Sequence, residues 1–176
     1  MFNYTDMKLF VYLSIFIMLI TSGLSNDLQS KSNRVISVMD FDQFEPWLHK
    51  QSDSVYVVNF WATWCAPCIR EIPDFEQIHK EYSDRGVKVL LVSLDHPNRI
   101  DGHVVPFLDR LGVDSQVVLL DDPFANRWIP KVSEKWSGAI PATVIYNKDQ
   151  KVFFEKELKF EELEEIIVPM ISNIKH

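Results

Sequence analysis

Two cysteines separated by two residues are the strongest chemical signal in this sequence of 176 residues. Cys65 and Cys68 are its only cysteines, and they follow directly on a strand-like run at residues 55–61. If a helix begins at this motif, Cys65 lies at its N-terminus, where unpaired N–H groups and the helix dipole favour the thiolate. The thiolate is the form of cysteine that attacks a disulfide. The spacing therefore predicts dithiol–disulfide exchange, in which Cys65 attacks and Cys68, one turn further on, closes the ring and releases the partner.

Other uses of such a pair are less well supported by the sequence. Tetrahedral zinc needs four ligands, and the sequence has neither a second Cys-x-x-Cys pair nor two histidines at the usual spacing. A purely structural disulfide would close a very short loop, which gains the least stability. A copper carrier would need a third soft ligand, and the methionines and histidines show no suitable spacing. We therefore predict no metal site and no cofactor other than the redox-active disulfide of Cys65 and Cys68.

Three stretches of the sequence resemble a known family. They are the run 59–73, Asn-Phe-Trp-Ala-Thr-Trp-Cys-Ala-Pro-Cys-Ile-Arg-Glu-Ile-Pro, the strand-like run 87–95 ending in Ser-Leu-Asp, and the run 138–146, Gly-Ala-Ile-Pro-Ala-Thr-Val-Ile-Tyr. Together they are similar to the thioredoxin superfamily, and specifically to its TlpA/ResA-like branch of extracytoplasmic thiol-disulfide oxidoreductases. The resemblance implies a single thioredoxin-like domain, which we assign to residues 35–176.

The resemblance also implies how a substrate is held. Pro141 corresponds to the cis-proline that faces the cysteine motif, so the backbone of Ile140 would be presented to an extended substrate, which pairs with it like an added strand. Trp64, Ala66 and Pro67 complete the expected substrate-binding set. Pro67 also suits the first turn of a helix, where its missing N–H has no consequence.

Two further positions bear on proton transfer. Thioredoxin has a buried aspartate six residues before its first cysteine, whereas this sequence has Asn59, which carries no carboxylate. Glu71 corresponds to the active-site glutamate of the ResA-like branch, and it follows Cys68 at a spacing that keeps both on nearly the same helix face. Partial burial would raise the pKa of its carboxyl group toward neutrality, which suits proton exchange. The alternative is a solvated surface acid, the commonest environment of glutamate.

The surrounding elements alternate between strands and helices, which predicts an α/β protein. The expected architecture is the thioredoxin fold, a central mixed β-sheet flanked by helices on both faces. We expect an N-cap at Asp40 and a kink at Pro73. Strands are expected at residues 35–38, 55–60, 87–94, 116–120, 142–146 and 152–156, and helices at residues 41–50, 66–83, 100–111, 127–136 and 160–174. Residues 96–112 lie where TlpA-like proteins carry extra central elements, which would narrow the substrate groove.

The first residues predict the compartment. Residues 9–20 form a mainly apolar run, which is shorter than the ~20 residues that span a bilayer comfortably and typical of a signal-peptide core. We therefore assign residues 1–25 to a signal peptide or N-terminal membrane anchor and residues 26–34 to a flexible linker. Either assignment places the domain outside the cytoplasm, in the periplasm or secreted.

Composition and resemblance together define the expected function. A net charge of −7 argues against a nucleic-acid partner. The resemblance implies an exported thiol-disulfide oxidoreductase that acts as a reductant of protein disulfides, as in cytochrome c maturation, with electrons from a membrane dithiol donor. The alternatives are a disulfide oxidant or isomerase, a peroxiredoxin-like antioxidant, whose peroxidatic motif differs from the residues around Trp64 and Pro67, and a metal-binding module.

Overall fold

A mixed six-stranded sheet is the centre of the computed structural model, which describes residues 34–172. The strands lie in the order β1-β4-β3-β2-β5-β6. Neighbours from β1 to β2 run parallel, whereas β5 is antiparallel to β2 and β6 is antiparallel to β5. The strands are β1 Ser37–Met39, β2 Val55–Trp61, β3 Val87–Ser93, β4 Gln116–Leu120, β5 Ala142–Tyr146 and β6 Lys151–Phe154. The assignments for residues 1–25 and 26–33 lie outside the described residues.

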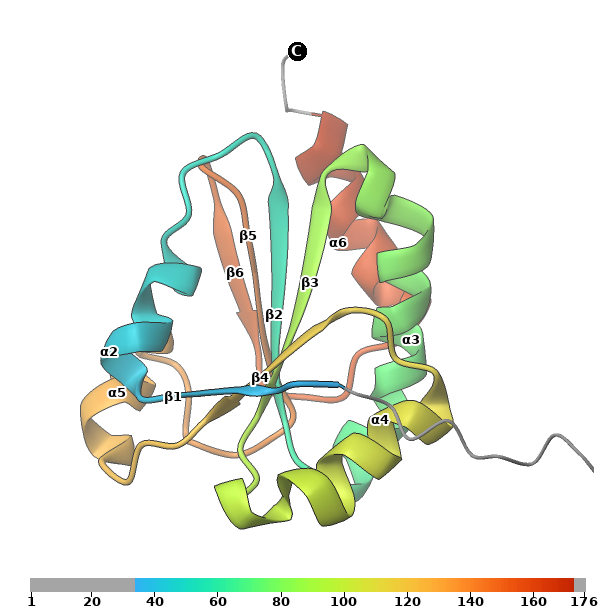
Figure 1. The fold of residues 1–176 in the computed structure, drawn as a ribbon. Coiled ribbons are helices and arrows are strands. Elements are labelled where there is room, and N and C mark those ends of the chain that lie inside the picture. The colour runs from blue at the N-terminus through green and yellow to red at the C-terminus, as the bar shows by residue number, and fades with distance from the viewer. Residues whose placement is uncertain (1–33, 173–176) are drawn as a thin grey trace, which may run out of the picture. The chain divides into compact units, whose positions relative to one another are not determined.

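Helices cover both faces of this sheet, which confirms the predicted fold class (Figure 1). One face packs against α3 Ala66–Tyr82, α4 Val105–Leu111 and α6 Phe160–Ser172. The other face packs against α2 Phe41–Phe44, the 3₁₀ turn η1 Glu45–Leu48 and α5 Ala125–Val132. Within residues 34–172, no helix combines the length and the apolar character needed to cross a membrane.

The central strand β2 contributes side chains to the cores on both faces of the sheet, and all of its residues are buried. Successive side chains of a strand point to opposite faces. Val57 and Trp61 accordingly lie in the core beneath α3, whereas Val58 and Phe60 lie in the core beneath α2 and α5. The same alternation directs Asn59, the one polar residue of β2, toward the α3 side.

Two helices differ from the bounds expected from the sequence, and each contains or adjoins a proline. The helix expected at 41–50 is a short α-helix followed by a 3₁₀ turn with Pro46 in its first positions, because proline lacks the N–H that an α-helix would use. The helix expected at 127–136 is wrong at both ends: α5 starts at Ala125 and stops at Val132, two residues after Pro130. In contrast, α3 continues through Pro73 as one helix. Asp40 caps α2 as predicted, accepting from the Gln43 N–H at 2.9 Å.

Residues 100–111 depart most from the single helix that was expected there. A 3₁₀ turn, η3 Pro97–Arg99, is followed by a π-helical turn, η4 Ile100–Val104, and only then by α4. Pro106 lies at the start of α4, where its missing N–H is tolerated. Gly112, in the left-handed region with φ 62°, ends α4, a conformation that glycine adopts without steric penalty. The remaining differences are shifts of one or two residues at the ends of β1, β2, α3, β3 and β6, and the expected end of the last helix at residue 174 lies outside the described residues.

Candidate active site

Cys65 and Cys68 lie where β2 has ended and α3 begins, and they form a disulfide with an S–S distance of 2.01 Å. Cys65 is the N-cap residue of α3, and the backbone N–H of Cys68 points at Cys65 Sγ over 3.3 Å. Pro67 occupies the first turn, where no intrahelical partner for an N–H exists. Cys65 exposes 6% of its surface, whereas Cys68 exposes 0%. Of the two cysteines, Cys65 is therefore the more exposed to an incoming disulfide.

The loop before β5 lies against this disulfide. The Ile140–Pro141 peptide bond is cis, as the resemblance implied, and the Ile140 carbonyl oxygen lies 3.6 Å from Cys65 Sγ. β5 pairs antiparallel with β2, so the first residue of β5 lies beside the last residues of β2 at the same end of the strands. Pairing of these strands therefore brings together two motifs that are far apart in the sequence.

The predicted substrate-binding residues of the cysteine motif lie at the surface or close to it. Trp64 is 63% exposed, Ala66 is exposed and Pro67 is half-buried. Trp61, by contrast, is completely buried, and its ring centroid lies 5.3 Å from that of Phe107. An exposed tryptophan next to a reactive pair is a residue type that contributes strongly to protein contacts.

Glu71 is fully buried, so the alternative of a solvated surface acid is wrong. Its Oε1 accepts a hydrogen bond from Asn59 Nδ2 at 2.7 Å, and its Oε2 accepts one from the backbone N–H of Leu158 at 2.9 Å. Asn59 Nδ2 also donates to Thr143 Oγ1 at 3.0 Å. The carboxylate of α3 is therefore connected to β2, β5 and the segment after β6.

Burial raises the pKa of Glu71 to about 7, although the hydrogen bonds from Leu158 and Asn59 act in the opposite direction. A carboxyl group with such a pKa can gain and lose a proton near neutral pH. It lies on the same helix as Cys68, one turn further from the helix N-terminus. The chemical environment therefore fits the proton-transfer role that the resemblance implied, and that role stays a prediction.

Other polar residues position the two loops, and sequence reasoning did not identify them as functional. Asp95, buried after β3, accepts from the Thr63 N–H at 2.8 Å and from Thr63 Oγ1 at 2.6 Å, which fixes the residues just before Cys65. The strand ending in Ser-Leu-Asp was part of the resemblance, but its aspartate received no role. Asp95 is therefore a positioning residue for the cysteine motif.

The loop before Pro141 is held in a similar way. Glu155 accepts hydrogen bonds from the Ser137 N–H at 3.2 Å and from the Ala139 N–H at 3.0 Å. On the other side, the Trp136 indole N–H donates to the Ala139 carbonyl at 2.7 Å. A partly exposed glutamate after β6 has no distinctive sequence pattern, because only the pairing of β6 with β5 brings it to this loop.

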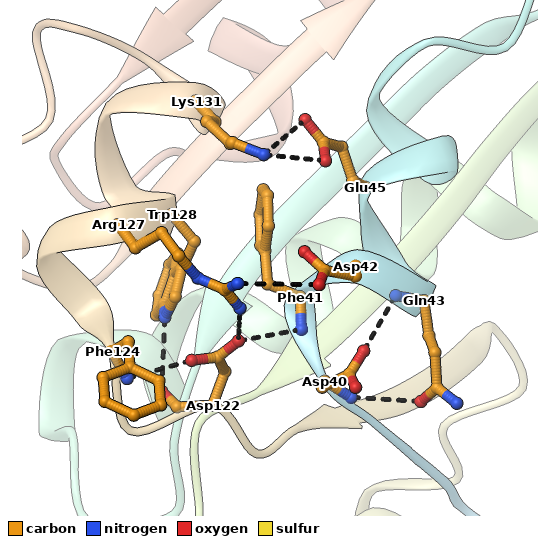
Figure 2. Close-up of polar contacts among 10 residues, drawn as sticks. All are labelled: Asp40, Phe41, Asp42, Gln43, Glu45, Asp122, Phe124, Arg127, Trp128 and Lys131. Carbon is orange, nitrogen blue, oxygen red and sulfur yellow. Dashed lines mark hydrogen bonds and ion pairs between the residues drawn. The ribbon is translucent and has the colours of Figure 1, made fainter.

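A second polar network connects α2 and α5, which pack on the face of the sheet opposite to α3 (Figure 2). The side chain of Asp122 accepts from the Phe41 N–H at 3.2 Å, from the Phe124 N–H at 2.9 Å and from the Arg127 guanidinium at 2.9 Å. The Trp128 indole N–H donates to the Asp122 carbonyl at 3.2 Å. Phe41 and Trp128 belong to the core on the α2 and α5 face of the sheet, and the network connects the starts of these two helices.

The residues from 34 to 172 contain no group of three or more His, Cys, Asp or Glu side chains that could hold a metal ion. The only redox group identified among them is the Cys65–Cys68 disulfide.

Comparison with known proteins shows which protein family this sequence matches. Residues 36–154 match the model of the AhpC/TSA family. The thiol-disulfide oxidoreductase ResA of Geobacillus thermodenitrificans is 30% identical over 95 residues, which are 54% of this chain and 49% of that relative. The chain therefore matches about half the length of this relative.

Solved structures show the same fold. A secreted thiol-disulfide isomerase from Corynebacterium glutamicum superposes with a TM-score of 0.58 at 24% identity, covering 69% of this chain and 73% of that one. A thioredoxin-related protein from Neisseria meningitidis serogroup B superposes with a TM-score of 0.60 at 23% identity, covering 72% and 91%. At these identities the likeness concerns the fold.

Proposed function

The chain belongs to the AhpC/TSA family, and on that premise we propose that it is a thiol-disulfide oxidoreductase acting on protein cysteines. The observation that carries this proposal is the position of Cys65. It caps α3, is bonded to Cys68 and lies 3.6 Å from the Ile140 carbonyl oxygen. A reactive sulfur beside the backbone of a partly exposed residue suits the docking of an extended, disulfide-bearing segment.

In the reductive direction, the reduced pair supplies two electrons to the substrate. The Cys65 thiolate attacks one sulfur of a substrate disulfide, the substrate S–S bond breaks, and the first substrate thiolate leaves and takes up a proton. A mixed disulfide now joins Cys65 to the substrate. Cys68 then loses its proton and attacks Cys65 Sγ, which forms the Cys65–Cys68 bond and releases the second substrate thiolate.

In the proposed mechanism, Glu71 manages the proton of the buried Cys68 thiol. Asn59 cannot do so, because a side-chain amide has no readily titrated proton. Trp64, Ala66, Pro67 and Ile140 form the docking surface around the disulfide, and Pro141, which is buried, lies directly after Ile140 beneath this surface. Glu71 instead lies in the interior on the same helix as the resolving cysteine, and its hydrogen bond from Asn59 connects its carboxylate to β2.

We further propose that the protein acts outside the cytoplasm as a reductant, with electrons supplied by a membrane dithiol donor. The apolar run at residues 9–20 supports export. The similarity to a relative named ResA supports a thiol-disulfide activity. Cytochrome c maturation is one task that fits this direction of exchange.

A redox titration combined with a turnover assay tests the proposal. Couples of this superfamily span roughly −270 to −120 mV, and a reductant should lie near the negative end. The purified protein should also accelerate the reduction of insulin disulfides by dithiothreitol, and Cys65→Ser should abolish the acceleration. A potential near the positive end would instead favour an oxidant or isomerase. Consumption of hydrogen peroxide by the reduced protein, without disulfide exchange, would favour a peroxidase.

A further inference from the structure

A hollow of 260 Å³ lies directly beside the cysteine motif, and basic residues line it. One wall is formed by Thr63 and Ile69, which flank the Cys65–Cys68 segment on its two sides. Its other lining residues include Arg99, His103 and Arg110, from the irregular segment that runs from η3 into α4. The irregular segment η3–η4–α4 therefore supplies the basic lining of a hollow next to Cys65 and Cys68.

Sheet topology places this hollow on a different side of the disulfide from the loop before Pro141. The cysteine motif follows β2, which lies between β3 and β5 in the sheet. Pro141 directly precedes β5, whereas Arg99, His103 and Arg110 follow β3. A substrate segment that pairs with the backbone of Ile140 on the β5 side and continues across the disulfide therefore reaches the hollow on the β3 side.

The cations around the hollow are only partly neutralised. Arg99 Nε lies 3.5 Å from the carboxylate of Asp95, an acid already engaged with Thr63. Arg110 lies over the ring of Phe107 at 5.6 Å, and within the described part of the chain neither Arg110 nor His103 forms an ion pair.

The acidic residues of the same segment do not neutralise the basic residues that line the hollow. Asp109 pairs with Arg34 at 3.5 Å. Asp101 is exposed on the η4 turn and does not line the hollow. The hollow is therefore a local cationic site on a chain whose net charge is −7.

We propose that this basic hollow binds the carboxylate of an Asp or Glu side chain that lies near the reacting cysteine of the protein substrate. The inference rests on the proposed disulfide exchange and names the substrate class of that same site. A guanidinium group presents N–H donors in a planar fork that matches a carboxylate. Thr63 is two residues from Cys65, a chain distance of at most about 7 Å, so the acid should stand within roughly two or three residues of the substrate cysteine.

Peptides that differ by one charge test this inference. Each carries a single cysteine activated as a mixed disulfide with 2-thiopyridine, and the residue two positions from the cysteine is either Glu or Gln. Attack by Cys65 on the peptide sulfur releases pyridine-2-thione, which is followed by absorbance. Glutathione disulfide provides a second arm, because its carboxylates belong to a small molecule rather than to a protein segment.

For the wild-type chain, we expect the Glu peptide to react about 3- to 5-fold faster than the Gln peptide at low salt, in the range of one or two partly exposed ion pairs. Added salt should reduce the ratio. Arg110→Gln should bring the ratio close to 1 while the rate with the Gln peptide is kept. Arg110→Lys should retain a preference, because it keeps the charge.

Arg85→Gln is the matched control. Arg85 is also exposed and also lies over an aromatic ring, that of Tyr82 at 4.8 Å, but it follows the opposite end of α3. The control removes the same charge from the chain, so it should leave the ratio unchanged. An equal fall in Arg85→Gln would attribute the preference to net charge and overturn the site.

The remaining outcomes separate this inference from the proposed function. Equal wild-type rates with both peptides, or a ratio that survives Arg110→Gln, would overturn the carboxylate site and leave disulfide exchange intact. Dependence on Arg110 with glutathione disulfide alone would show that a small acid, and not a protein segment, is the ligand. Failure to react with any disulfide would remove both the inference and the proposed function.

Discussion

The amide of Asn59 and the carboxylate of Glu71 form a hydrogen bond of 2.7 Å in which both side chains are completely buried. One comes from the central strand β2 and the other from α3, the helix that Cys65 caps and that contains Cys68. A buried carboxylate needs such donors, because burial without a partner disfavours its charged form. The pair therefore places a titratable group of unusual pKa in the interior behind the disulfide.

Glu71 should make stability fall as the pH rises. Its pKa is about 7 in the folded protein, against an ordinary value of 4.5. Between these values the folded state retains a proton that the unfolded state has lost, so the free energy of unfolding decreases with rising pH, by about 3 kcal/mol in total. Glu71→Gln should remove this dependence. Denaturant unfolding of the oxidised protein from pH 4 to pH 8 measures it.

The matched control for this experiment is Glu81→Gln, which changes an exposed glutamate of the same helix. It should keep the pH dependence of the wild type. If Glu71→Gln and the wild type lose stability in parallel over this range, Glu71 does not carry the raised pKa, and its proposed role in proton transfer loses its support.

The reduced protein should be alkylated first at Cys65. This sulfur belongs to the accessible cysteine, at the N-terminus of α3, whereas Cys68 is fully buried. Both the helix end and the exposure favour reaction of Cys65 as a thiolate. Iodoacetamide labelling followed by peptide mapping checks the order, and labelling in denaturant serves as the control, where the difference should shrink. Earlier modification of Cys68 would reverse the assigned roles.

Removal of the resolving cysteine should trap substrates. In Cys68→Ser, Cys65 can still attack a disulfide, but no second thiol releases the mixed disulfide, so covalent adducts should accumulate. Non-reducing electrophoresis after mixing with disulfide-bonded proteins detects these adducts, and they should disappear on reduction. Cys65→Ser should trap nothing. Similar amounts of adduct with both variants would contradict a fixed order of attack.

Asp122 should matter for stability rather than for exchange. Its carboxylate is 2% exposed and accepts hydrogen bonds from both helix starts shown in Figure 2. Burial opposes its ionisation, but the hydrogen bonds from Phe124, Arg127 and Phe41 outweigh this and lower its pKa. Asp122→Asn should therefore lower the free energy of unfolding by about 1–3 kcal/mol at neutral pH. Because a lowered pKa stabilises only the ionised form, this difference should shrink as the pH falls below about 4.

Asp42→Asn is the control for this network. Asp42 also pairs with Arg127, at 3.5 Å, but its side chain is 64% exposed. Such a surface pair contributes about 1 kcal/mol or less. Equal thermal and denaturant stability of the two variants would show that the buried hydrogen bonds of Asp122 add nothing beyond its charge.

Much of the architecture could be predicted from local sequence patterns. Alternating strands and helices predicted the fold class, and β3 was located to within one residue because an almost continuous apolar run indicates a strand buried on both faces. Cys65 could be placed at a helix start because proline and the cysteine spacing act within a single turn. The helix ends near Pro46 and Pro130 were harder, since a proline can start, continue or end a helix depending on its surroundings.

The sequence by itself determined which residues could carry the chemistry: a pair of cysteines after a buried strand, a proline before another strand, and a glutamate one turn beyond the pair. Only the tertiary structure decided their environments. The hydrogen bonds to the buried Glu71 carboxylate come from Asn59 of β2 and from the Leu158 N–H after β6, and the basic hollow forms because η3, η4 and α4 lie beside the start of α3. The pKa of a carboxyl group and the charge around a sulfur atom depend on neighbours in space, and those neighbours come from distant parts of the chain.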